Sequence, residues 1–140
     1  MAVLITLVPP QVTILDAGVG TVTLERRLGG THGASEALVA RGVAASPGVA
    51  VVQLEEHAGA LARLIGGLEG VRAMHDGAVA RLAEGGRALT VLSDGAGGAE
   101  LKIGGSGVEG FSLSLTGDGL HGLIADLRAL QDWPTAIATG

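Results

Sequence analysis

The run Gly105-Ser106-Gly107-Val108-Glu109-Gly110 fits the pattern G-x-G-x-x-G. In dinucleotide-binding proteins this pattern joins a strand to a helix whose N-terminus faces a pyrophosphate. Here the run is followed by Phe111–Leu115, where apolar and polar residues alternate with the period of a strand. We therefore interpret the run as a hairpin turn. The glycine-rich stretch 29–35 lacks the lysine of a phosphate-binding loop and is interpreted as a loop.

Histidine is the side chain that titrates nearest to neutral pH, and it is a common metal ligand. The chain has four: His32, His57, His75 and His121. None has a second histidine at the i+4 spacing of a helical zinc site. The strongest pair, His57 and His75, would lie more than about 20 Å apart along a continuous helix, too far to share a ligand. Since the chain also lacks cysteine, we predict no catalytic, cofactor-binding or metal-binding residue.

Most acidic residues have structural explanations. Asp118 is predicted to cap the second helix, and Glu55 and Glu56 to begin the first, where carboxylates favour the helix dipole. Asp16 and Asp94 each precede a glycine-rich hairpin turn, where an aspartate side chain bonds nearby backbone. A carboxylate pair for glycoside hydrolysis would need a cleft lined with aromatic side chains. The chain has one Phe, one Trp and no Tyr, so we exclude that chemistry.

The charge balance argues against nucleic acid as a partner. Nine Lys and Arg stand against 14 Asp and Glu, a net charge of −5, and Arg26-Arg27 is the one adjacent basic pair. No stretch approaches the roughly 20 apolar residues of a membrane span. The apolar start, residues 1–8, lacks the basic segment of a signal peptide. We expect a cytoplasmic protein, from a high-GC bacterium or its phage, with no nucleic-acid or membrane partner.

The elements that would position any site form an apparent internal repeat. Residues 12–24 align with residues 89–103, and each segment is a β-rich run, an aspartate with a glycine-rich turn, and a second run. Val3–Val8 precedes the first hairpin as Ala78–Ala83 precedes the second. A short helix is the alternative for Ala78–Ala83, because Ala, Arg and Leu favour helix.

Two amphipathic helices follow the strands with the same spacing of apolar residues, i, i+3, i+4, i+7 and i+10. These residues are Leu61, Leu64, Ile65, Leu68 and Val71, then Leu120, Leu123, Ile124, Leu127 and Leu130. The offset between the helices is shorter than that between the hairpins, which predicts an insertion in the first half. We assign it to the strand pair Glu36–Ala45 and Gly48–Leu54, where the second half has the single strand Phe111–Leu115.

These elements predict an α+β fold, a mostly antiparallel sheet with two amphipathic helices on one face, arranged as strands then helix, twice. The length fits one domain, residues 1–140, with pseudo-repeat halves 1–71 and 77–131. Gene duplication is the simplest origin, although two such units in an Ala-, Leu- and Gly-rich chain can look alike by composition. The core must come from 20 Leu, 14 Val, 6 Ile and 22 Ala. Such a light core would gain stability from a partner.

Because no catalytic constellation emerges, we expect a non-catalytic protein-interaction module, such as an immunity or antitoxin-like partner or a regulatory adaptor. Its acidic surface would steer a basic partner. One alternative is a self-assembling structural subunit of a phage particle or bacterial compartment that associates by sheet extension. Another is a small enzyme with a dispersed site. The candidate partner-binding residues are Glu36, Glu55, Glu56 and Trp133. Trp133 would either plug the core at the end of the second helix or anchor an interface.

Overall fold

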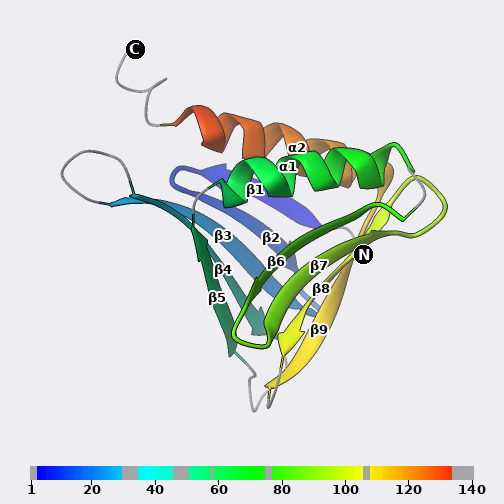
Figure 1. The fold of residues 1–140 in the computed structure, drawn as a ribbon. Helices are drawn as coiled ribbons and strands as arrows, with labels where there is room; N and C mark the ends of the chain where they lie inside the picture. The colour runs from blue at the N-terminus through cyan, green and yellow to red at the C-terminus, as the bar shows by residue number, and fades with distance from the viewer. Residues whose placement is uncertain are drawn as a thin grey trace.

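Two antiparallel sheets face each other, with a pair of adjacent helices at one end (Figure 1). The computed structural model describes residues 3–29, 35–45, 51–57, 59–74, 77–105 and 108–133. Sheet A consists, in chain order, of β1 (Leu4–Val8), β2 (Gln11–Asp16), β3 (Gly20–Gly29), β4 (Ser35–Ala44) and β5 (Val51–His57). After α1 (Ala60–Arg72), sheet B consists of β6 (Val79–Glu84), β7 (Arg87–Ser93), β8 (Ala99–Gly105) and β9 (Val108–Leu115), and α2 (Gly117–Asp132) follows. The architecture is the α+β class that the sequence predicts.

The two hairpins aligned in the sequence have corresponding strand pairs. Val12 lies opposite Leu24 between β2 and β3, and Leu89 lies opposite Ile103 between β7 and β8. Sheet A nevertheless has five strands and sheet B has four. A common origin of the two halves therefore stays a prediction.

Aspartates stabilise the turns of both hairpins. The Asp16 carboxylate accepts a hydrogen bond from the Gly18 N–H at 3.0 Å. The Asp94 carboxylate accepts from the N–H groups of Ala96 at 2.7 Å and of Gly98 at 3.0 Å. Both aspartates have the turn role that the sequence predicts, because their side chains replace a backbone acceptor within the turn.

One aliphatic core fills the space between the sheets and beneath the helices. Alternate residues of the central strands point inward and are buried, as the period of two requires. The largest fully buried side chains include Ile14, Leu24, Leu38 and Leu54 from sheet A and Leu82, Leu89, Leu101, Ile103 and Leu113 from sheet B. No polar or charged residue in the described part of the chain is buried.

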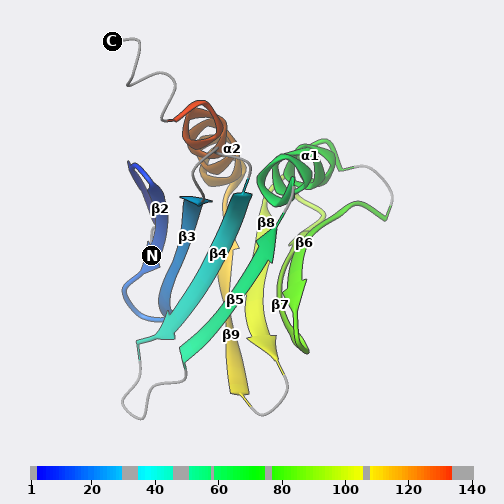
Figure 2. The same cartoon turned by 60° about the vertical axis from the view of Figure 1, so that its left-hand side comes forward.

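Each helix packs against the sheet formed by the other half of the chain. α1 follows sheet A along the chain but lies mainly against β6 and β7 of sheet B, and α2 follows sheet B but lies against β1 and β2 of sheet A. Figure 2 shows the two helices end-on, with α1 nearer β6 and α2 on the side of sheet A. All ten residues of the two predicted apolar stripes are buried, which confirms the helical period.

Glycines let the ring of Phe111 in sheet B lie close to the backbone of sheet A. A Cβ atom on Gly20 would lie 2.8 Å from the ring of Phe111 in β9, and one on Gly42 would lie 3.2 Å from it. The single Phe of the chain therefore fits where β3 and β4 carry no side chain. On the helix side, a Cβ on Gly67 would come within 2.8 Å of the Ala80 backbone, so α1 lies unusually close to β6.

One prediction about the start of the first helix was wrong, and the strand before this helix extends further than predicted. The strand predicted over Gly48–Leu54 is β5, Val51–His57, with residues 46–50 outside the described part of the chain. Glu55 and Glu56 therefore belong to this strand instead of starting the helix. α1 starts at Ala60, after Gly59 with a φ of 79°, and its first turn has no acidic residue.

Two further expectations concern the second half. Asp118 was predicted to cap the second helix, but the Thr116 hydroxyl does so by accepting a hydrogen bond from the Gly119 N–H at 3.0 Å. Asp118 lies two residues after Thr116, in the first turn of α2, where its charge still favours the helix dipole. Of the two alternatives for Ala78–Ala83, the strand is correct, because this segment pairs with β7 as β6.

Leu123 tests the core. Its side chain is 1% exposed at the centre of the α2 stripe, so Leu123→Ala should lower the free energy of unfolding by about 2–5 kcal/mol. Leu92→Ala removes the same atoms from a side chain that is 39% exposed and should cost less than about 1 kcal/mol. Chemical denaturation of both variants provides the measurement, and equal losses would contradict this description of the core.

Candidate functional site

The four predicted partner-binding residues fall into two places. Glu36 lies in β4 and Trp133 directly follows α2, and both contact Arg26 of β3. Glu55 and Glu56 lie in β5, where sheet A meets sheet B.

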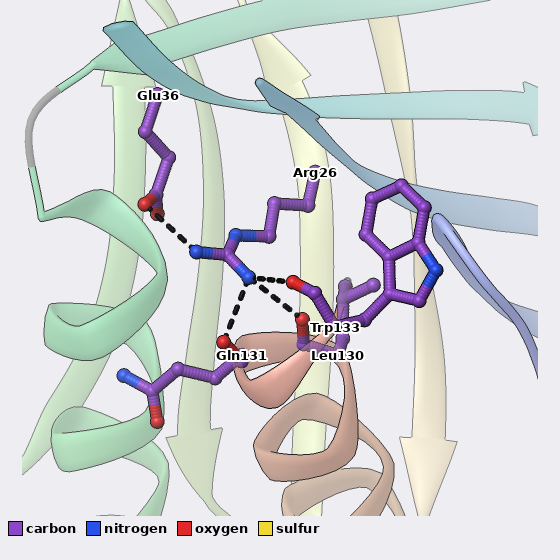
Figure 3. A network of polar contacts seen from close by, with 5 residues as sticks. All are labelled: Arg26, Glu36, Leu130, Gln131 and Trp133. Atoms are coloured by element: carbon purple, nitrogen blue, oxygen red, sulfur yellow. Dashed lines mark hydrogen bonds and ion pairs between the residues drawn. The ribbon is translucent and has the colours of Figure 1, made fainter. Parts of the chain in front are cut away.

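Arg26 joins sheet A to the end of α2 (Figure 3). Its Nη2 forms an ion pair with Glu36 Oε2 at 3.1 Å. Its Nη1 donates to the carbonyl oxygens of Leu130 at 3.1 Å, of Gln131 at 2.7 Å and of Trp133. The last turn of α2 contains no basic residue. Arg26 therefore supplies the positive charge that the carbonyl end of a helix favours.

The contacts of Arg26 stabilise the fold at the end of α2. The side chain of Arg26 is 13% exposed, and a guanidinium so far from water needs charged or carbonyl partners. The Trp133 N–H donates to the carbonyl oxygens of Ala129 and Leu130, which closes the helix. Trp133 thus acts as the C-cap of α2. Arg26 was not identified from the sequence, because its helix partners lie more than 100 residues away.

Two glutamates connect the edge strands β5 and β6. Glu56 Oε1 accepts a hydrogen bond from the Ala83 N–H at 3.2 Å, and its Oε2 pairs with Arg63 of α1 at 2.9 Å. In the opposite direction, Glu84 Oε1 accepts from the Glu55 N–H at 2.9 Å. The two carboxylates satisfy backbone donors that an edge strand would otherwise present to another chain.

These contacts bear on the predicted acidic surface. Both carboxylate oxygens of Glu56 have partners within the chain, and Glu36 is paired with Arg26. Glu55 lies 3.5 Å from the exposed imidazole of His57. A role for Glu36, Glu55 and Glu56 in steering a partner stays a prediction.

The sequence also contains histidines and a glycine-rich run whose residue types are used in metal and nucleotide sites. Among the described residues, no three His, Asp or Glu side chains are close enough to hold a metal ion. His57 and His121 are exposed, and His32 and His75 lie outside the described ranges. The G-x-G-x-x-G run connects β8 to its antiparallel partner β9, as expected of a hairpin. No helix in the described ranges is long and apolar enough to span a membrane.

The outer face of β1 and β2 carries exposed apolar side chains. Leu4 is 59% exposed, Val8 65% and Leu15 37%. Leu4 and Leu15 lie directly opposite each other, so they form a cross-strand pair that water contacts. Isolated exposed leucines are common, but this group lies at the edge of a sheet.

The four sheet edges differ in how they are protected. β5 and β6 are connected by Glu56 and Glu84, and β9 pairs with β8 through a register shift between Ile103 and Gly105. Bulges and inward charges are features that discourage pairing with another chain. β1 pairs regularly with β2 over all five of its residues, Leu-Ile-Thr-Leu-Val, and contains no charge. Among the described edges, β1 is the one that lacks such a feature.

Comparison of the chain with protein-family models and with curated proteins gave no match. A function must therefore be argued from the described surfaces.

One carboxylate on α2 is perturbed by its surroundings. Asp126 is half-buried on the helix, and desolvation raises its pKa above the ordinary value of 3.8. Asp126 lies three residues after Leu123 and four before Leu130, beside the apolar stripe of α2. This carboxylate was not identified from the sequence as partly buried. Its effect is on stability.

Arg26→Ala should lower the free energy of unfolding by about 1–3 kcal/mol, because it leaves Glu36 without its partner and the carbonyls of α2 without a donor. The adjacent Arg27 provides the control, since its side chain is 53% exposed on the other face of β3. Arg27→Ala should change stability by less than about 0.5 kcal/mol. Hydrogen exchange in the last turn of α2 should accelerate in the first variant alone; equal exchange in both would argue against the cap.

Asp126→Asn tests the raised pKa. A folded-state pKa above the unfolded value means that the folded protein binds the proton more tightly, so stability falls as pH rises through this range. The asparagine variant lacks this loss. Its melting temperature should exceed that of the parent at neutral pH, and the difference should vanish below about pH 3. A difference that does not vary with pH would assign the effect to packing.

Proposed function

We propose that this protein is a non-catalytic interaction module that binds an extended segment of a partner protein at the free edge of β1. The observation that carries the proposal is the regular, uncharged edge of β1 beside the exposed side chains of Leu4, Val8 and Leu15. This function belongs to the same class as the immunity, antitoxin-like or adaptor roles expected from the sequence.

The chemistry of an edge strand defines the partner segment. Unpaired N–H and C=O groups of an edge accept a further strand, and alternate side chains of that strand then contact one face of the sheet. On the outer face these contacts would be with Leu4 and Val8, so the partner segment should be uncharged and apolar at alternate positions. The net charge of −5 favours a partner that is basic elsewhere on its surface.

Self-assembly is a second candidate, favoured by the sequence of β1 itself. If two copies paired antiparallel about Thr6, Leu4 would face Val8 and Ile5 would face Leu7 of the other copy, in both directions. Such self-complementarity is what a two-fold interface requires. The resulting sheet would contain strands of two sheets A.

Leu4→Lys tests both candidates. A lysine here places a charge on the strand edge and removes part of the apolar contact, so binding at β1 should weaken at least tenfold. Leu92→Lys is the matched control, because Leu92 is a 39% exposed leucine on the interior strand β7 of sheet B. Light scattering across concentrations measures self-association, and affinity capture from the native host at low salt measures binding of other proteins.

A dimer that Leu4→Lys dissociates and Leu92→Lys preserves would support self-association. A monomer whose captured partner is lost with Leu4→Lys alone would support the hetero-partner. If neither variant changes the molecular mass or the captured proteins, binding at β1 is contradicted.

A further inference from the structure

A hollow of about 250 Å³ lies on the outer face of sheet A. Val39 forms its floor, and six polar side chains from β2 to β5 surround it: Gln11, Thr23, Glu25, Arg27, Arg41 and Gln53. This combination of an apolar floor and a few convergent polar groups is typical of small-molecule sites.

The low exposure of Val39 shows that the surrounding polar side chains cover it from solvent. Its neighbours in β4, Leu38 and Ala40, belong to the inner core, so alternation turns Val39 to the outer face. Val39 is nevertheless 3% exposed. The longer polar side chains around it therefore stand above the sheet and enclose the hollow.

The charges of the hollow are unequally compensated. Glu25 is neutralised by Arg27, whose Nη2 lies 3.1 Å and whose Nε lies 3.2 Å from the same carboxylate oxygen. Arg41 is exposed and has no ion pair or side-chain hydrogen bond within the described part of the chain. Its direct cross-strand neighbours are Thr23 in β3 and Gln53 in β5, which are neutral and can donate hydrogen bonds. One guanidinium is therefore available to a ligand.

We propose that this hollow binds the oxyanion group of a small polar molecule, a carboxylate or a phosphate, through Arg41. A guanidinium offers two parallel N–H donors to such a group, and Thr23 and Gln53 stand on either side to donate further hydrogen bonds. The site is independent of strand addition at β1.

A second hollow, on the outer face of sheet B, serves as a comparison. It is lined in part by Thr90, Lys102 and Ser112. Its cation is already engaged, because Lys102 Nζ lies 3.8 Å from Glu100 Oε1. The hollow of sheet A therefore carries the stronger argument for an anionic ligand.

The test is an amide NMR titration of the whole protein with succinate and, separately, with inorganic phosphate at constant ionic strength. Saturable shifts should occur at Thr23, Arg41 and Gln53, and Arg41→Gln should weaken the apparent affinity at least tenfold. Arg81→Gln is the matched control, since Arg81 is likewise an exposed strand arginine, in β6 of sheet B. This control should bind as the parent does.

Saturation with succinate alone would indicate that the ligand is a carboxylate. Saturation with phosphate alone would indicate a phosphate ligand, and either result supports the site. The absence of saturable shifts in both titrations would falsify the proposal. Equal weakening by Arg41→Gln and Arg81→Gln would also overturn it, because binding would then follow the general charge of the protein.

Discussion

The structure depends on the burial of two apolar sheet faces, each of which is covered by the helix that belongs to the other half of the chain. α1 lies against sheet B and α2 against sheet A, and a single core runs between them. Because the core side chains are aliphatic, burial relies on many small contacts and on close approaches such as that of Phe111 to Gly20 and Gly42. Arg26, which is 13% exposed, lies outside this core and joins β3 to the end of α2.

Local structure was largely predictable because it depends on short-range periodicity. The apolar stripes around Leu64 and Leu123 predicted both helices, and the alternation of apolar and polar residues predicted the hairpin strands. Glu55 and Glu56 were misplaced because two carboxylates before an apolar helix suit an N-terminus as well as a strand end. Glu56 has its backbone partner in Ala83, 27 positions later, and no spacing rule reveals such a contact. The packing of α1 on sheet B and of α2 on sheet A could not be predicted either, because these contacts also join residues far apart in the chain.

The last strand of sheet A, β5, connects several features of this arrangement. β5 brings the backbone of sheet A against β6, where the two glutamates satisfy donors on both strands. It also supplies Gln53 to the wall of the outer hollow. The same strand thus covers one edge of sheet A and contributes to the hollow on its outer face, while β1 at the opposite edge of the sheet pairs regularly with β2.

The exchanged helices have a consequence for folding during synthesis. The strands of sheet A are made first, and their pairing is between neighbours in the chain, so hairpins can form early. The inner face of β1 and β2 nevertheless waits for residues 117–132, which emerge from the ribosome more than 100 residues later. During that interval an apolar nascent sheet is uncovered, and exposed surface of this kind attracts chaperones or other nascent chains. The completion of the fold is therefore tied to a late event in translation, when α2 docks and the first strands are finally removed from water.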